Sequence, residues 1–275
     1  MCILFFILNK FPKADQYKLI LAANRDEYYA RPASVAERWK ECDFVIGGRD
    51  LEPGREGGTW LAISTGTKDK TFKFGSLLNI TGEPIDENAL HRGNLVVDYV
   101  KNPISNVEYC QNLIDTDKKF NSFNLITIEI GAEINRTVHY SNVNNVVQEW
   151  PCNEPLAFGN SLSHEPYEKV KAGREKFREI INRENQSKDD LVNSLKNFLC
   201  DREKHWPDEV LNRRVSKWAD KLSSICVRHD GANYGTRTRT IILIDGNNKV
   251  DFYEETMTST NPDDAWTRTH IQTEF

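Results

Sequence analysis

A cysteine stands at position 2, between the first methionine and the apolar run Ile3–Leu8. Methionine before a residue as small as cysteine is commonly removed during synthesis, which would leave Cys2 with a thiol and a free α-amine. The amine titrates at ~7.7–8.0 and the thiol at ~8.5, so the amine can accept the thiol proton close to neutral pH. One residue then supplies both nucleophile and base. A second interpretation stays open, in which Cys2 is a small apolar residue of a buried strand.

An N-terminal nucleophile needs a group that holds the amine, donors for the developing oxyanion, and a cation beside the substrate. Side chains of these kinds stand at the ends of predicted strands. They are Asn24, Arg25 and Asp26 in "NRDE", then Asn79, Asn160, and Arg237 in "YGTRTRT". Each also has an ordinary interpretation, because "NRDE" can be a charged loop or a structural ion pair, and Arg237 can lie on the surface of a strand.

The composition is that of an ordinary soluble globular protein, with 275 residues of which 39% are hydrophobic and 28% charged. A formal net charge of -5 without blocks of like charge argues against nucleic acid as a general partner. The opening apolar run is too short to cross a bilayer and lacks the features of a signal peptide, so we expect no transmembrane segment. Six scattered cysteines without a Cys-x-x-Cys pair predict reduced thiols in the cytoplasm and no structural metal.

Apolar patterning in the first half predicts mostly strands. Ile3–Leu8 and Tyr17–Ala23 form a predicted hairpin, with the polar residues of "NRDE" ending its second strand. Thr59–Ser64 and Phe72–Ile80 form a second hairpin if Thr65–Lys70 is the turn between them. Short helices are expected in "RGNLVVDYV" and "SNVEYCQNLI", and another hairpin from Phe123–Ile130 and Thr137–Ser141.

The second half predicts helices and then strands again. Helical spacing runs from His164 to about Asp201, with a second helix beginning near Ser187. Strands are expected in "SSICVR", "RTIILID", "VDFYEETM" and "WTRTHIQTEF", with a turn at Asp245-Gly246-Asn247-Asn248. No repeat or linker divides the chain, so we predict one domain spanning residues 1–275. The element order indicates an α+β fold in which antiparallel sheets are covered by helices.

The sequence resembles a known family, the NRDE family, over nearly its whole length. The segments that carry this resemblance are "MCILFF", "LILAANRDEYYARP", "GGRDLEPGREGGTWLAIS", "RG" at 92–93, "FNLI", "FGNSL" and "YGTRTRTIILID". The resemblance implies an N-terminal-nucleophile hydrolase-like fold, which is an αββα sandwich of two antiparallel sheets between helical layers.

A more distant resemblance to penicillin V acylases and bile salt hydrolases implies roles for individual residues. Cys2 matches their nucleophile, Asn160 their oxyanion-side asparagine, and Arg237 their late active-site arginine. Asn24-Arg25-Asp26-Glu27 lies where those enzymes place an arginine and an aspartate, but in a different order, so which residue holds the amine stays open. Around Asn79 the family usually reads Leu-Thr-Asn, whereas this chain reads Leu77-Leu78-Asn79.

For function, the family resemblance implies intracellular haem trafficking, in which haem moves from storage or synthesis sites to haemoproteins. It also implies links to secretion, Golgi organisation, mitochondria and lysosome-related organelles. Haem, or another amphipathic small molecule, would be the ligand, with haemoproteins or membrane haem exporters as partners. Cys2 and His164, which lies four residues beyond Asn160, are the candidate axial ligands. Covalent haem is excluded because the chain has no Cys-x-x-Cys-His motif.

Two other functions remain as alternatives. In the first, the chain is a hydrolase whose Cys2 attacks an amide or thioester and forms an acyl-Cys2 intermediate, with Asn79 and Asn160 stabilising the oxyanion. In the second, it is a structural or membrane-trafficking adaptor. The adaptor has the least support, because no basic amphipathic helix or lipidation motif is present.

Overall fold

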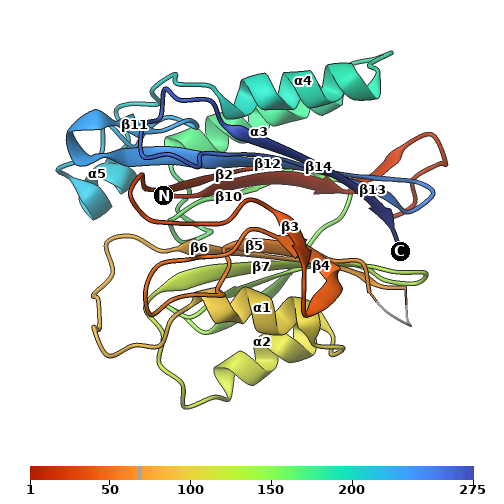
Figure 1. Ribbon diagram of the computed structural model, residues 1–275, viewed down its shortest axis with the longest axis horizontal. Helices are drawn as coiled ribbons and strands as arrows, with labels where there is room; N and C mark the ends of the chain where they lie inside the picture. The colour runs from red at the N-terminus through yellow and green to blue at the C-terminus, as the bar shows by residue number, and fades with distance from the viewer. Residues whose placement is uncertain (67–69) are drawn as a thin grey trace.

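The computed structural model describes residues 1–66 and 70–275, and it has four layers (Figure 1). Two antiparallel sheets lie face to face. Helices α3 (Glu168–Ile181) and α4 (Lys188–Leu199) cover the outside of one sheet, and α1 (Gly93–Lys101) and α2 (Asn106–Ile114) cover the outside of the other. The α+β prediction is therefore confirmed, in the αββα arrangement that the family resemblance implied.

Each sheet of the described residues has seven strands. The first has the order β10 (Leu156–Phe158), β1 (Ile3–Leu8), β2 (Tyr17–Tyr28), β12 (Tyr234–Asp245), β13 (Lys249–Thr256) and β14 (Thr267–Glu274), with β11 (Arg228–His229) paired to β12. The second has the order β3 (Glu37–Trp39), β4 (Cys42–Gly47), β5 (Leu61–Ser64), β6 (Phe72–Asn79), β7 (Phe123–Ile130), β8 (Asn135–Ser141) and β9 (Val146–Trp150). The first sheet thus joins strands from both ends of the chain.

Strand β1 is apolar on both faces because each face covers a different layer. Ile3 and Phe5 pack against the helices, whereas Leu4 and Phe6 pack against the second sheet. Side chains alternate along a strand, so the residues just before β1 continue this pattern. Met1 accordingly belongs to the helix-side core, and Cys2 contacts the core between the sheets.

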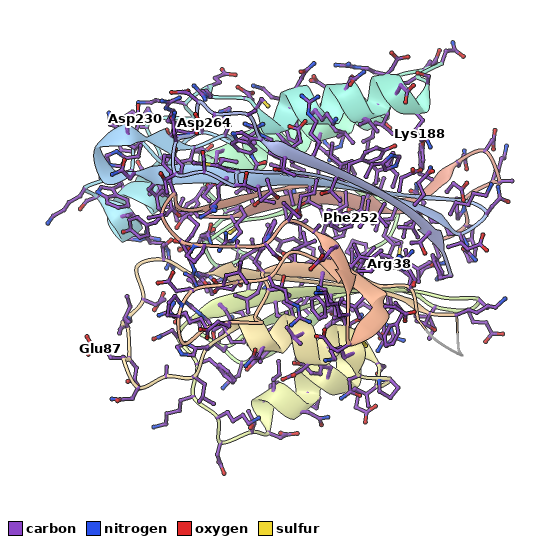
Figure 2. All side chains as sticks on the ribbon, viewed as in Figure 1. Arg38, Glu87, Lys188, Asp230, Phe252 and Asp264 are labelled. Carbon is purple, nitrogen blue, oxygen red and sulfur yellow. The ribbon has the colours of Figure 1, made fainter. Side chains whose placement is uncertain are left out.

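Three apolar layers hold the sandwich together: one under α3 and α4, one between the sheets, and one under α1 and α2. Figure 2 shows side chains filling the space between the sheets, with Phe252 among them and Lys188 and Asp230 on the surface. The β1 strand reaches two of these layers, so its position is fixed from both sides.

Most predicted elements are confirmed. The first hairpin, the α1 and α2 helices, the β7–β8 hairpin and the helical pair are present. The 245–248 turn joins β12 to β13, and the Ser187 side chain caps α4 by accepting from the Asp190 N–H at 3.1 Å. Strands β5 and β6 also pair as expected. The predicted turn between them includes residues 67–69, which lie outside the described residues.

Two predictions about local structure are wrong. "NRDE" does not end the second strand, because β2 continues to Tyr28 and pairs with β12 along this stretch. "SSICVR" forms no strand before Arg228, and Cys226 donates to the carbonyl of Asp201 instead. The patterns also missed β3, β4, β9 and the short helix α5 (Glu209–Val215). No helix in the described part of the chain is long and apolar enough to cross a membrane.

We expect Gly173→Ala to destabilise the protein. A Cβ at Gly173 in α3 would lie 2.5 Å from a ring carbon of Phe5, and that ring is closed in by Phe177 and Phe198. Overpacking costs ~1–3 kcal/mol, against a gain of ~1 kcal/mol in helix propensity. Because the contact at 2.5 Å is severe, we expect a cost near the upper end of this range, and urea unfolding should show a net loss of ~2 kcal/mol in the free energy of unfolding. Arg174→Ala, on an exposed position of α3, is the control, and an equal or greater stability of Gly173→Ala would contradict the packing described here.

Candidate functional site

The register of β1 places Cys2 between two of the predicted site residues. Leu4 pairs with Ala23 on β2 and with Phe158 on β10. Two residues earlier in the chain, the same register brings Cys2 opposite Arg25 on one side and Asn160 on the other. All three residues line one cavity of about 610 Å³, which opens between the two sheets at this end of the sandwich.

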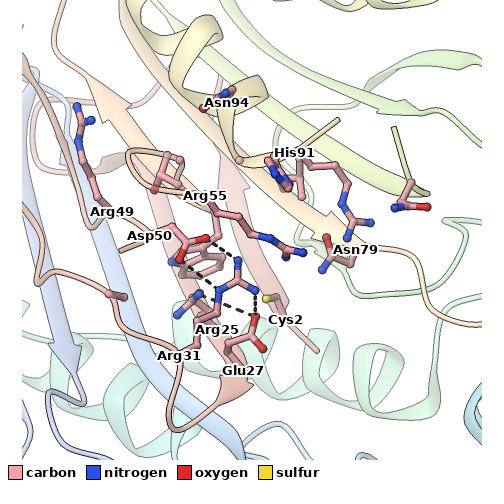
Figure 3. A pocket seen from close by; sticks show the side chains of 18 of the residues that line it. Cys2, Arg25, Glu27, Arg31, Arg49, Asp50, Arg55, Asn79, His91 and Asn94 are labelled. Carbon is pink, nitrogen blue, oxygen red and sulfur yellow. Dashed lines mark hydrogen bonds and ion pairs between the residues drawn. The ribbon is translucent and has the colours of Figure 1, made fainter. Parts of the chain in front are cut away.

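The cavity draws its wall from both sheets and from the segments that connect their strands and helices. Figure 3 shows the Cys2 thiol in this wall, together with Arg25, Glu27 and Asn79. Most of the other lining side chains are polar or charged, with a few apolar ones among them. They include Arg31, Arg49, Asp50, Arg55, Glu56, Trp60, Leu77, Thr81, Ile85, Asp86, Leu90, His91, Arg92 and Glu254. The volume falls within the ~300–1,000 Å³ typical of small-molecule sites.

A network of ion pairs forms one side of the cavity (Figure 3). Arg31 donates to both oxygens of Asp50, at 3.2 and 2.5 Å, and to Glu27 at 2.9 Å. Glu27 also lies 4.0 Å from Arg25. Burial alone would raise the pKa of Glu27, but the charges of Arg25 and Arg31 outweigh it and the pKa is lowered. Glu27 is therefore held ionised.

Arg25 keeps binding capacity that the protein does not use. The residue is 7% exposed and lines the cavity. Its Nη1 is buried and has no hydrogen-bond partner among the described residues. A buried guanidinium nitrogen without an acceptor is costly, and a carboxylate or a developing oxyanion would satisfy it.

Asn160 and Asn79 join the two sheets beside Cys2. The Asn160 Nδ2 donates to the backbone carbonyl of Asn79 at 2.5 Å, and its Oδ1 has no partner within the described residues. Thr81 donates to the Asn160 carbonyl from both its backbone N–H and its hydroxyl, each at 3.0 Å. One hydrogen of the Asn160 amide thus remains for a ligand, because the amide nitrogen carries two.

A hydrogen-bonded chain supports the Asn160 backbone from the second sheet. Asn124 on β7 donates to the carbonyls of Gly159 and Ser161, at 3.3 and 2.8 Å. The Nε2 of His139 lies 3.0 Å from the Asn124 Oδ1. Because this oxygen can only accept, His139 must donate from Nε2. Burial lowers the pKa of His139 to about 4 and so keeps the ring neutral at pH 7.

Asp26 faces the helix side of the first sheet rather than the cavity centre. Its Oδ1 accepts from the Thr236 hydroxyl at 2.6 Å, and its Oδ2 lies 3.9 Å from the α-amine of Met1. That amine also donates to the Asp26 backbone carbonyl at 3.1 Å. Burial lowers the pKa of the amine and raises the pKa of Asp26. Burial likewise raises the pKa of the Cys2 thiol.

Three predicted site residues lie elsewhere. Asn24 is fully buried and donates to the carbonyls of Leu199 and Ile225, so it ties β2 to the helical layer. Arg237 is the extra residue of a β-bulge between Thr236 and Thr238. His164 is exposed and does not line the cavity.

Arg237 is enclosed by backbone carbonyls. Its Nη1 donates to Tyr28, Tyr29 and Arg31, and its Nη2 donates to Met257. Burial lowers the pKa of Arg237 to about 10. Arg237 thus holds the end of β2 in place, and Arg25 is the arginine that meets Cys2 across the ladder.

The structure therefore brings together Cys2, Arg25, Asn79 and Asn160 at one cavity, with Asp26 behind Cys2. Their catalytic roles stay a prediction. The sequence motifs missed His91, Arg92 and the Arg31–Asp50 pair as cavity residues, and also the buried Lys169. Arg31, Asp50 and Arg92 lie inside the motifs that carry the family resemblance, which was the one signal available for them.

We expect stability to fall as the pH drops from 6.5 toward 4 because of His139. The unfolded chain binds a proton at ~6.5, whereas the folded chain binds it only at about 4. The unfolded state therefore gains protons first, and the free energy of unfolding drops by ~3 kcal/mol across this window. His139→Gln should remove this part of the pH dependence in urea unfolding, with His164→Gln as the matched control. A slope that His139→Gln leaves intact would count against the neutral, buried ring.

Comparisons with known proteins show which protein family the chain belongs to. The Transport and Golgi organisation 2 family model matches residues 1–259. Transport and Golgi organization protein 2 of Drosophila melanogaster is 42% identical over 281 residues, covering 100% of this chain and 99% of that protein. The Homo sapiens homolog is 34% identical over 278 residues, covering 98% of each. A solved structure of the Caenorhabditis elegans N-acylethanolamine-hydrolyzing acid amidase ortholog matches with a TM-score of 0.41 and 12% identity, over 95% of this chain and 94% of that one. The chain belongs to the Transport and Golgi organisation 2 family.

Proposed function

We propose that the cavity binds an amphipathic small molecule that carries carboxylate groups, and that this molecule is haem in transit through the cytoplasm to haemoproteins. The observation that supports the proposal is a set of guanidinium groups in the cavity wall, of which Arg55 and Arg92 form no ion pair within the described residues. Haem combines an apolar ring with two propionates, so it needs cations at one end of its site and apolar contacts at the other.

The cations available for propionates are Arg25, Arg55 and Arg92. Arg92 donates to the carbonyl of Ser122 at 2.8 Å and forms no ion pair within the described part of the chain. Burial, together with the positive charges of Arg55 and Arg31, lowers the pKa of Arg92 to about 10. Repulsion among these guanidinium groups is unfavourable in the empty cavity, and an anionic ligand would relieve it.

Contacts for the ring of haem come from Trp60, Leu77, Ile85 and Leu90. Ile85 and Leu90 are 81% and 50% exposed, which places apolar side chains where a ligand would enter or leave. For axial ligation, Cys2 and His91 line the cavity, and His164 does not. Because the Cys2 thiol has a raised pKa, thiolate ligation would be weak, and weak ligation suits a protein that must release its cargo.

A second candidate function is a cysteine hydrolase, and the position of Cys2 between Arg25 and Asn160 favours it. After removal of Met1, Cys2 would carry the amine that accepts the thiol proton. The free hydrogen of the Asn160 amide and the Nη1 of Arg25 would then face the oxyanion of an amide or thioester substrate. A chain that keeps Met1 lacks this base on Cys2, so the hydrolase, unlike the carrier, needs the processed form of the protein.

For the carrier, we expect haemin to give a saturable Soret change. Arg92→Gln and Arg25→Gln should each raise the Kd about tenfold, because a charge-assisted hydrogen bond contributes ~1.5–3 kcal/mol. Haemin dimethyl ester lacks the carboxylates, so it should bind the wild-type protein no more tightly than haemin binds the two arginine variants. Arg174→Gln, on the exposed face of α3, is the matched control.

Axial ligation can be read in the same titration. Cys2→Ala or His91→Ala should shift the Soret maximum of the complex, whereas His164→Ala should not. A Kd that is the same for haemin, its ester and both arginine variants would contradict carriage of haem in this cavity.

For the hydrolase, we expect activity only in protein whose intact mass shows loss of Met1. A fluorogenic panel of acyl amides and thioesters would find the substrate class. Asn160→Ala should then lower kcat by ~10²–10³-fold, as loss of one oxyanion donor does, and Cys2→Ala should abolish turnover. Full activity in Met1-retaining protein, or in Cys2→Ala, would exclude this mechanism.

A further inference from the structure

Strand β14 forms a long and regular edge of the first sheet. It has eight residues, Thr267–Glu274, and it pairs with β13 along its whole length without a register shift. The strand order of this sheet ends at β14, so within the described residues no strand pairs with its outer side. Figure 1 shows β14 in dark blue, leading to the C-terminus. The N–H and C=O groups on such an open edge are a template for a further strand.

The features by which proteins usually protect an open edge are absent from β14. Open edges are kept from pairing by short strands, by lysine or proline, or by bulges. The sequence "TRTHIQTE" contains no lysine or proline, and half of its residues are β-branched, which favours an extended strand. By contrast, the edge strands β3 and β10 have three residues each. Strand β14 therefore has the length and composition of a strand that is paired on both sides.

Charges of opposite sign lie near the two ends of β14. Arg268 is near its beginning and Glu274 is its last residue, with Ile271 midway between them. Arg268 contacts Glu255 on β13, which Lys196 of α4 also contacts, so the Arg268 side chain lies on the helix side of the sheet. Glu274 lies on the same face because side chains alternate along a strand. An antiparallel copy of β14 can therefore bring each arginine opposite a glutamate.

A two-fold axis through Ile271, perpendicular to the sheet, produces this match. Rotation about the axis keeps each face of the sheet on its own side, and it places Arg268 of one copy opposite Glu274 of the other, twice. Thr269 meets Thr273, and the two Ile271 side chains meet at the axis. Opposite charges and threonines in directly opposite positions stabilise antiparallel strands. Moving the axis by one residue in either direction removes both Arg–Glu pairs, so the charges select this register.

Both charged residues have capacity for a second partner. The Arg268 side chain is 79% exposed and contacts Glu255 through Nε at 3.3 Å, which leaves its two Nη groups for another acceptor. Glu274 is exposed, and it lies opposite Lys249 on β13 without an ion pair in the described part of the chain. Across two paired copies, the charges in this row would alternate: Lys249, Glu274, then Arg268 and Glu255 of the second copy. Complementary charges of this kind favour one partner and one register.

We propose that β14 is a dimer interface, at which a second copy of this chain pairs antiparallel with the first about a two-fold axis at Ile271. The first sheets of the two copies then form one continuous sheet, and the open edge is covered. Strand β14 contributes no residue to the cavity lining described above, so each copy keeps its own site accessible. The inference concerns assembly and depends on neither proposed function.

The oligomeric state of the full chain tests this interface. Sedimentation velocity over ~1–100 μM should show a monomer–dimer equilibrium for the wild-type protein. Arg268→Glu places two glutamates opposite each other at both ends of the interface, and Glu274→Arg places two arginines there. Each variant should raise the dimer Kd at least ~tenfold, because like charges directly opposite each other destabilise paired strands. Arg174→Glu, on the exposed face of α3, is the matched control and should leave the Kd unchanged.

Mixing the two charge variants tests the register itself. In a heterodimer of Arg268→Glu with Glu274→Arg, every glutamate at the two positions again faces an arginine. The equimolar mixture should therefore dimerise at concentrations at which each variant alone is a monomer. A mixture that stays monomeric would contradict the pairing of Arg268 with Glu274.

A cross-link locates the axis without changing any charge. In Ile271→Cys the two thiols meet at the axis, within the Cα separation that a disulfide allows, so mild oxidation should join two chains at this position. Mass spectrometry of the joined peptide identifies the link, and Thr267→Cys, away from the axis, should not link to itself. A wild-type chain that stays monomeric over the whole concentration range would overturn the proposal and leave the edge to a strand of another protein. A dimer that neither charge variant weakens would overturn it as well.

Discussion

Strand β1 has a neighbour on each side, and its hydrogen-bond register with both decides where the Cys2 thiol goes. A slip of one residue would turn Cys2 toward the helices and Met1 toward the cavity, because side chains alternate between the faces of a sheet. The two faces of β1 resist such a slip. Phe5 fits against Gly173, where no Cβ could be accommodated, while Leu4 and Phe6 fill the layer between the sheets. Packing on both faces of β1 therefore decides that Cys2, and not Met1, points toward the core between the sheets.

The second constraint is the free-energy cost of burying charged side chains away from water. The cavity wall pairs Arg31 with Glu27 and Asp50, but among the described residues it leaves Arg92 without an ion pair and the Arg25 Nη1 without an acceptor. Unbalanced charge of this kind costs folding free energy unless something else binds it. An anionic ligand therefore stabilises the site most beside those guanidinium groups that the protein leaves without a counter-charge.

Local patterns predicted the elements that have strong periodicity, and family motifs predicted part of the site. The register that unites Cys2 with Arg25 and Asn160 could not be predicted, since it depends on pairing between residues far apart in sequence. "NRDE" looked like the end of a strand because four polar residues in a row are unusual in a sheet interior. Pairing with β12 and the bulge at Arg237 keep it extended. The bulge also explains why Arg237 lies outside the cavity lining: one inserted residue turns its side chain toward the carbonyls of Tyr28 and Tyr29.

Met1 links the two proposed functions physically. Its side chain belongs to the helix-side core, 3.8 Å from the Thr81 hydroxyl, and its amine takes up the space beside Asp26. With Met1 in place, the thiol remains a neutral wall of a cavity that can hold a ligand. Without it, the α-amine would belong to Cys2, the nucleophile itself. Because the folded chain encloses Met1 at 6% exposure, an aminopeptidase would have to act before β1 joins the sheet. Removal of Met1, on which the proposed hydrolase depends, would therefore have to take place during synthesis.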